Sequence, residues 1–144
     1  MAELKGQCLC GAVKISARLP KPEFQACHCG QCQRWTGGGP LYAVRVKDLE
    51  LTGEKDIHPY HHSEWGERAT CKTCGSILYW RLQGRSIAFV AVGLLDDQTG
   101  MALTEEIFVD NRPPWMTPVE GASQATEAEM KAQLAAFLEK EKNQ

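Results

Sequence analysis

The sequence has no long apolar run and no excess of charge of one sign. None of its hydrophobic stretches approaches the roughly 20 residues that a membrane-spanning helix needs, and the segment Met1–Gly6 lacks the apolar core of a signal peptide. The 16 lysines and arginines nearly balance 18 acidic residues, so the net charge is −2, which gives no general affinity for nucleic acid or for an anionic membrane. We therefore expect a cytoplasmic protein that binds neither nucleic acid nor a membrane.

The size and composition of the chain are those of an ordinary globular protein. It has 144 residues, of which 43% are hydrophobic and 24% charged, and this length is enough to bury a core. No internal repeat, low-complexity segment or change of composition marks a boundary. We therefore expect a single domain over residues 1–144.

Most of the chain predicts β-strands, because apolar and polar residues alternate with a period of two. Val13, Ile15 and Ala17 alternate with polar residues in this way. A turn at Lys47–Asp48 and a hairpin across Gln83–Arg85 are expected to join neighbouring strands, and Gly37–Pro40 predicts a loop. The expected strands are Cys8–Arg18, Phe24–Cys27, Leu41–Val46, Leu49–Thr52, Lys55–His62, Ile77–Leu82, Ser86–Val92 and Glu105–Val109.

The C-terminal segment predicts a helix. Thr126 and Glu129 have the spacing of a capping box, and four apolar residues follow at helical spacing: Met130, Leu134, Phe137 and Leu138. We expect an amphipathic helix over about residues 127–142 that packs on the sheet. The predicted fold is therefore mainly β, antiparallel, with one C-terminal helix.

The seven cysteines stand in close spacings, which in a reducing compartment favour metal ligands over disulfides. Cys8 and Cys10 form one pair, and Cys71 and Cys74 form another. Two such pairs are the usual source of the four ligands of a structural zinc, and the glycine that follows each pair permits a tight turn. The alternative is that these are four unconnected core cysteines.

The remaining cysteines, Cys27, Cys29 and Cys32, fall within six residues. Three protein ligands with an open fourth position are typical of a catalytic metal site. Because three thiolates already neutralise the charge of a zinc ion, an incoming thiol suits the fourth position better than a hydrolytic water. Two alternatives stay open: a redox-sensitive thiol cluster, or a structural zinc completed by one of His28, His58, His61 and His62.

Three motifs carry a resemblance to a known family: Gly6–Val13, Cys27–Cys32 and Cys71–Gly75. Weaker similarities follow at Gly93–Asp97 and in the stretch 107–115. On these motifs the chain resembles the glutathione-dependent formaldehyde-activating (GFA) family over residues 6–115. Two positions depart from the pattern of many relatives, which place arginine where this chain has Gln33 and histidine where it has Glu106.

The resemblance implies a zinc-bound β-tent fold and two zinc ions per chain, the second of which is easily lost. One would be structural, on Cys8, Cys10, Cys71 and Cys74; the other would be catalytic, on Cys27, Cys29 and Cys32. It also implies a carbon–sulfur lyase whose substrates are a small thiol and an aldehyde, with glutathione as co-substrate and S-hydroxymethylglutathione as the product from formaldehyde.

Three residues are candidates for contact with the co-substrate. Arg34 is suited to hold a glutathione carboxylate, Gly38 and its neighbouring glycines to donate N–H groups to a developing alkoxide, and Trp115 to form a wall of the pocket. His28 is a candidate proton shuttle. Both of its neighbours in the sequence, Cys27 and Cys29, are candidate metal ligands, so its side chain is free to point away from the metal site. The rival functions are a non-catalytic zinc-stabilised binding module and a thiol or metal sensor.

Overall fold

The structure is a computed structural model that describes the backbone of residues 2–142 and the side chains of residues 2–140. The chain forms two compact units, each of which is described by itself. The first contains the chain up to Phe24 and Tyr42–Ala102, and the second contains Gln25–Leu41 and the chain from Leu103 onward. The single domain expected over residues 1–144 stays a prediction.

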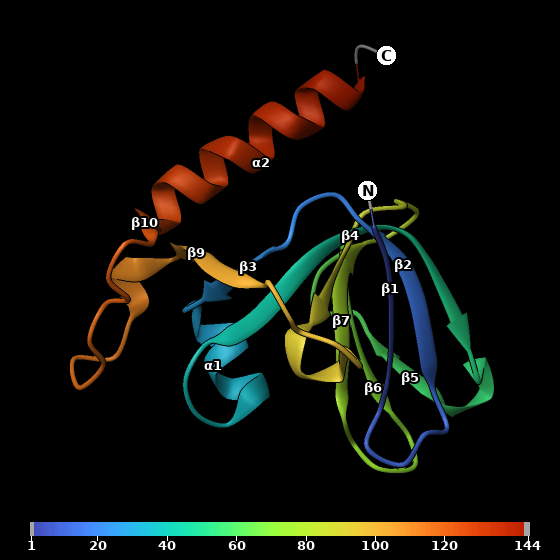
Figure 1. The fold of residues 1–144 in the computed structure, drawn as a ribbon. Helices are drawn as coiled ribbons and strands as arrows, with labels where there is room; N and C mark the ends of the chain where they lie inside the picture. Colours follow the sequence, from blue (N-terminus) through green and yellow to red (C-terminus); the bar gives the residue numbers. More distant parts are fainter. Residues whose placement is uncertain (1, 143–144) are drawn as a thin grey trace. The chain divides into compact units, whose positions relative to one another are not determined.

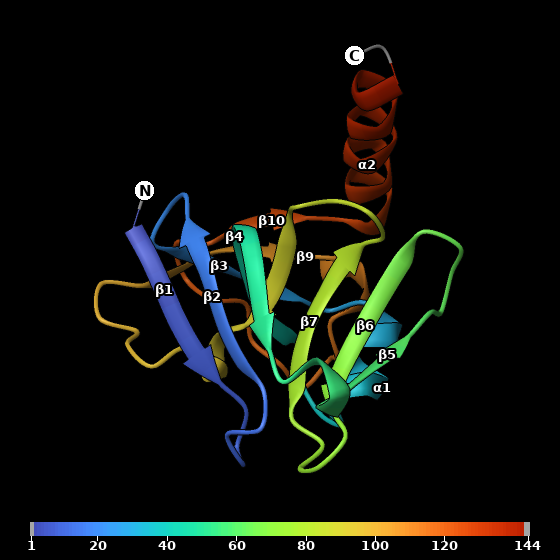
Figure 2. The same ribbon diagram turned by 90° about the vertical axis from the view of Figure 1, so that its right-hand side faces the viewer.

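The first unit is an open antiparallel sheet. Its strands follow the order β1-β2-β4-β8-β7-β6-β5, and each pairs antiparallel with its neighbour; Figure 2 shows β1, β2, β4, β7 and β6 arrayed in this way. The bounds are β1 Ala2–Gln7, β2 Lys14–Leu19, β4 Leu41–Thr52, β5 Ile57–Tyr60, β6 Gly66–Cys71, β7 Ile77–Leu82 and β8 Ala88–Ala91, with short 3-10 turns at Glu54–Asp56 and Val92–Leu94.

Alternating side chains from these strands form the core of the first unit. Val44, Val46, Leu78 and Val90 have no exposed surface, because every second residue of a strand points to the same face. Cys8 and Cys71 are only 2% exposed and belong to the same cluster. The paired cysteines therefore lie at the margin of the core that the strands build.

The structure corrects the predicted strands at several places. Leu41–Thr52 is one strand, so the predicted turn at Lys47–Asp48 is wrong; Asp48 adopts a positive φ of 52° beside a register shift in β2, an irregularity that a strand absorbs as a bulge. Strands β1, β6 and β10 (Ser123–Ala125) were not predicted, and the predicted strand Cys8–Arg18 begins only at Lys14. Strand β5 ends at Tyr60 and leaves His61 and His62 beyond it.

The second unit combines short strands with two helices. Its elements are β3 Glu23–Cys27, α1 Gly30–Thr36, β9 Ala102–Ile107, a 3-10 turn at Val109–Asn111, β10 Ser123–Ala125 and α2 Glu127–Lys142. Strand β9 pairs with β3 on one side and, in parallel, with β10 on the other. Strand β9 ends where Phe108 adopts a φ of 56°. The N–H of His28 donates to the carbonyl of Ile107 at 3.0 Å.

Helix α2 has the predicted bounds and the predicted capping box. The Thr126 hydroxyl accepts from the N–H of Glu129, whose carboxylate accepts from the N–H of Thr126. None of the side chains of residues 127–140 is buried, so the expected packing of an apolar face on the sheet is wrong. Figure 1 shows α2 as one straight helix that begins beside β10. Within the described residues, no helix is long and apolar enough to cross a membrane.

Candidate metal centres and the adjoining hollow

The four-thiol group, Cys8, Cys10, Cys71 and Cys74, is built by two turns of the first unit. One turn joins β1 to β2, where the N–H of Gly11 donates to the carbonyl of Cys8. The other turn joins β6 to β7, where the N–H of Gly75 donates to the carbonyl of Cys71. Both glycines adopt positive φ, 81° and 78°, which a side chain disfavours. Each glycine thus lets the chain turn back tightly after its pair of cysteines.

The spacing of the sulfur atoms fits a tetrahedral metal ion. The Sγ atoms of Cys8 and Cys10 are 3.7 Å apart, and those of Cys10 and Cys71 are 3.8 Å apart. Zinc–sulfur bonds of about 2.3 Å at tetrahedral angles would separate the sulfur atoms by roughly 3.8 Å. All four lie within 4.8 Å of one another, so the residues present fit a structural zinc.

The thiols of this group do not ionise alike. The hydroxyl of Ser76, 3.1 Å from Sγ of Cys74, and the N–H of the same serine lower the pKa of Cys74 to about 5. The N–H of Ala12 works to lower the pKa of Cys10, but burial and the neighbouring thiols raise it to about 12. Adjacent thiolates repel one another, and a bound dication would remove this conflict.

The three-thiol group, Cys27, Cys29 and Cys32, is built where β3 passes into α1. Cys27 ends the strand, and Cys29 is the N-cap residue of the helix, where its Sγ accepts the N–H of Cys32 at 3.3 Å. The three Sγ atoms lie within 4.8 Å of one another. Hydrogen bonds with Cys29 and Cys32, together with burial, raise the pKa of Cys27. Three clustered sulfur atoms that cannot all ionise alone are a donor set that fits a metal ion.

No fourth ligand joins this group within the described part of the second unit, because no histidine or carboxylate oxygen lies near all three sulfur atoms. His28 is fully buried and turns to Glu106 instead, with 2.8 Å between its Nε2 and Oε1 of Glu106. The other candidates, His58, His61 and His62, are exposed residues of the first unit, and His61 contacts Glu67. The geometry thus matches a site with three protein ligands.

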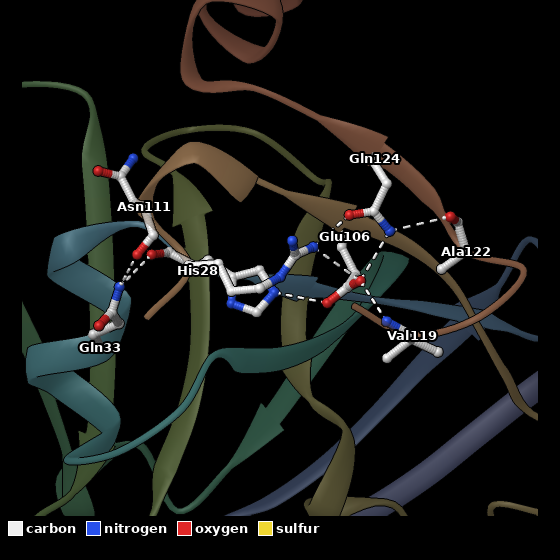
Figure 3. Close-up of polar contacts among 8 residues, drawn as sticks. His28, Gln33, Glu106, Asn111, Val119, Ala122 and Gln124 are labelled. Carbon is white, nitrogen blue, oxygen red and sulfur yellow. Dashed lines mark hydrogen bonds and ion pairs between the residues drawn. The ribbon is translucent and has the colours of Figure 1, made fainter. Parts of the chain in front are cut away.

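Glu106 is the centre of a buried polar cluster that sequence reasoning missed (Figure 3). Its Oε2 accepts from Nη2 of Arg112 at 3.1 Å, the N–H of Val119 at 2.9 Å and Nε2 of Gln124 at 2.9 Å. Burial works to raise the pKa of Glu106, but these hydrogen bonds, that of His28 and the charge of Arg112 lower it to about 2. Glu106 is therefore an anion. Because a carboxylate only accepts, Nε2 of His28 must carry its proton.

Gln33, at the other departure from the family pattern, ties α1 to its surroundings. Its Nε2 donates to the carbonyl of His28 at 2.7 Å and to that of Asn111 at 2.8 Å; Figure 3 shows the side chain reaching both. The sequence marked Gln33 and Glu106 as unusual positions but gave no sign of these partners. The two residues that depart from the family pattern therefore both hydrogen-bond to His28, which stands between two cysteines of the three-thiol group: Gln33 to its carbonyl and Glu106 to its ring.

A hollow of about 410 Å³ lies along α1, the helix that carries Cys32. It brings together the three candidate contact residues, Arg34, Gly38 and Trp115. Trp115 is 71% exposed, as a residue on the rim of a groove would be. The lining consists of Gly30, Gln33, Arg34, Gly37, Gly38, Gly39, Pro113 and Trp115. Gly30 and Gln33 directly follow Cys29 and Cys32 in the sequence, so the hollow begins at residues next to the three-thiol group, although none of the three cysteines lines it.

The fold and the two cysteine groups define a class: mainly β proteins with a four-thiol and a three-thiol candidate metal centre. The family model described as glutathione-dependent formaldehyde-activating enzyme matches residues 3–111. The chain belongs to this family, as the three cysteine motifs led us to expect.

Two further similarities accompany this match. A Schizosaccharomyces pombe protein named as an uncharacterized lyase is 25% identical over 114 residues, covering 78% of this chain and 83% of its own length. A crystal structure of a Rhodobacter sphaeroides protein superposes with a TM-score of 0.56 at 24% identity, covering 69% of this chain and 99% of its own. The first of these proteins is named as a lyase, and the second supports the fold.

Proposed function

We propose that this protein is a zinc-dependent carbon–sulfur lyase that reversibly joins a thiol to an aldehyde, with glutathione and formaldehyde as the first pair to test. Membership of the GFA family supports the reaction class. The observation that carries the proposal is the three-thiol group, which has no fourth ligand among the described residues of its unit and stands next in sequence to residues that line a hollow large enough for a small molecule.

Each cysteine group has a separate task under this proposal. The four-thiol group would hold a structural zinc, and Cys27, Cys29 and Cys32 would hold the catalytic one. A zinc ion there supplies a Lewis acid that lowers the pKa of a bound thiol from its ordinary value of about 8.5. Cys27 and Cys32 are buried and Cys29 is half-buried, so Cys29 presents the accessible side of the group.

The hollow would bind and orient the thiol. Arg34 extends from the last turn of α1, and its planar guanidinium suits bidentate binding of a carboxylate such as either of those in glutathione. Trp115 offers an apolar face against which the body of the thiol would pack. Both residues line the hollow, which supports their assignment to substrate binding.

The loop after α1 would stabilise the charge that develops on the aldehyde. When the thiolate sulfur attacks the carbonyl carbon, a carbon–sulfur bond forms and the oxygen becomes an alkoxide, which then takes up the proton that the thiol released. The N–H of Gly37 is already bonded to the carbonyl of Gln33 at 3.0 Å. The N–H of Gly38 has only a long contact of 3.5 Å with the Thr36 hydroxyl. Gly38 is therefore the better donor to the alkoxide.

His28 is not needed as a proton shuttle in this scheme. Its ring is fully buried, and its Nε2 is bonded to Glu106. We assign it to the support of the three-thiol group, because it stands between two of the cysteines and holds β3 to β9 through its N–H.

The test is the formation of S-hydroxymethylglutathione from carbon-13 formaldehyde and glutathione, followed by NMR against the uncatalysed rate. The wild-type protein should accelerate the exchange, and Cys29→Ser should remove the acceleration while the circular dichroism spectrum stays that of the wild type. Zinc content should fall from two ions per chain to one. A wild-type rate equal to the uncatalysed rate, with two zinc ions bound, would overturn the proposal for this substrate pair.

A further inference from the structure

The segment of residues 112–125 lies beyond the family match, which ends at residue 111. It runs from the end of the 3-10 turn, Val109–Asn111, to β10. All of its side chains from residue 113 to residue 121 are exposed or half-buried, so it forms no core of its own. Something other than apolar burial must hold it in one place.

Besides the pairing of β10 with β9 at its end, three hydrogen bonds anchor the segment, and all three end on the same carboxylate oxygen of Glu106. Arg112 donates from the start of the segment, the backbone N–H of Val119 from its middle and Gln124 from its end. Arg112 also donates to the side-chain oxygen of Gln124. Because hydrogen bonds to an ionised acceptor are stronger than neutral ones, this buried anion closes the segment into a loop.

The loop supplies one wall of the hollow. Pro113 and Trp115 line it from this side, opposite residues of α1 and its following glycines. Nearby, Cε of Met116 lies 3.8 Å from the place that a Cβ on Gly39 would occupy. The position of the loop therefore determines the width of the hollow, although Glu106 itself does not line it.

We infer that Glu106 is a positioning residue: it fixes the loop 112–125 and, through Trp115, sets the affinity of the hollow for its ligand. A carboxylate is needed here, because its two oxygens accept the three bonds from the loop and the bond from His28 together. A histidine in its place would have at most one accepting nitrogen. The loop as this structure holds it therefore depends on the carboxylate of Glu106.

The inference about affinity rests on the proposed function, so its test has two independent parts. The first is hydrogen exchange of the Val119 amide, whose acceptor is the Glu106 carboxylate. We expect Glu106→Gln to abolish its protection, because the amide group brings donors of its own to face the loop's donors, while the amides of β7 and β8 stay protected. The matched control is Glu105→Gln, which removes the same charge from the adjacent residue on the opposite face of β9.

The second part measures glutathione binding by calorimetry in a double-mutant cycle. Glu106→Gln and Trp115→Ala should each weaken binding about tenfold, and the double variant should be about tenfold weaker rather than a hundredfold, because both changes remove the same wall. Gln124→Ala, which removes one of the three anchors, should give a smaller loss and guards against a variant that fails to fold.

The inference would be overturned if the losses of glutathione affinity in the double-mutant cycle were additive, or if the Val119 amide were still protected from exchange in Glu106→Gln. If wild-type protein binds no glutathione, the proposed choice of thiol fails, and the exchange of the Val119 amide alone then decides whether Glu106 holds the loop.

Discussion

The four-thiol group of the first unit and the three-thiol group of the second differ most in the length of chain that each ties together. Cys10 and Cys71, whose sulfur atoms are 3.8 Å apart, are separated by 61 positions in the sequence. The three-thiol group is complete within six residues. A cross-link that closes a long loop removes much more freedom from the unfolded chain than one within a single turn. The first group is therefore placed to hold a fold, and the second is not.

Local surroundings sharpen this contrast. The four-thiol group joins the core cluster through Cys8 and Cys71, and Ser76 favours the thiolate of Cys74. The three-thiol group adjoins a hollow, and its unit is organised instead around the carboxylate of Glu106. The comparison teaches how the proposed roles divide: a cluster of cysteines would serve stability where it joins distant strands and would be available for chemistry where it lies within one short segment.

The largest expected effect comes from breaking the four-thiol group. We expect Cys71→Ser to lower the free energy of unfolding by several kcal/mol, since a structural zinc contributes on the order of 10 kcal/mol. Denaturant unfolding followed by circular dichroism, with zinc content measured alongside, checks this. Cys29→Ser is the control and should lose one zinc with little change in stability. Equal losses of stability in the two variants would show that the contrast between the groups is wrong.

The next effect concerns Glu106 and pH. Its pKa is lowered from 4.5 to about 2 in the folded protein, which corresponds to on the order of 3 kcal/mol of stabilisation. Since the folded state favours the carboxylate, this stabilisation is complete above about pH 5 and is lost as the pH falls through 4.5 toward 2.

Unfolding measured between pH 7 and pH 3 should therefore show a steeper loss of stability in wild-type protein than in Glu106→Gln. Glu105→Gln should follow the wild-type curve. Parallel curves for wild type and Glu106→Gln would mean that Glu106 is not the anion that organises the second unit.

A smaller effect is expected at Ser76, whose hydroxyl lowers the pKa of Cys74. Ser76→Ala should raise that pKa, so protons should compete better with zinc, and the loss of zinc affinity should grow as the pH falls. Changes of this kind around a metal site typically cost 10- to 100-fold in affinity. Zinc competition titrations at pH 6 and pH 8 test this, with the three-thiol group as the internal reference. An equal loss at both pH values would contradict the role of the hydroxyl.

The smallest effect is expected at the cap of α2. Thr126→Ala removes the hydroxyl that accepts the N–H of Glu129 and should cost about 1 kcal/mol of helix stability. Because no side chain of residues 127–140 is buried, only helical ellipticity should fall, with zinc content and the main unfolding transition unchanged. A variant that loses zinc from either group would show that α2 supports the metal centres after all.

Spacing alone predicted the cysteine groups, because ligands that are close in sequence are close in space whatever the rest of the fold does. The predominance of β-strands was also predictable, from the alternation of apolar and polar residues with a period of two. The bounds of α2 were predictable from its capping box. Helix α1 was not, because its N-cap is a cysteine and not one of the usual capping residues. Strand β4 was divided in error, because Asp48 looks like a turn residue but is accommodated within the strand.

The polar cluster around Glu106 was beyond the reach of sequence reasoning. Its partners are spread along the chain at His28, Arg112, Val119 and Gln124, and one of them takes part only through its backbone. No local pattern connects them, since the parallel pairing of β9 with β10 brings the last of them into place. The departure from the family pattern at Glu106 was the one available signal.

The distance that separates the pairs of the four-thiol group has a consequence for synthesis on the ribosome. By the time Cys32 has emerged, five thiols are exposed, and the final partners of Cys8 and Cys10 do not yet exist. At about 5–20 residues per second, the chain needs roughly 2 to 8 s more to deliver Cys74. If both groups bind zinc as proposed, the three-thiol group is complete during that interval and would take up the ion, while Cys8 and Cys10 would compete with it. Under the proposed function, correct loading of the two groups with zinc is therefore a matter of timing as well as of affinity.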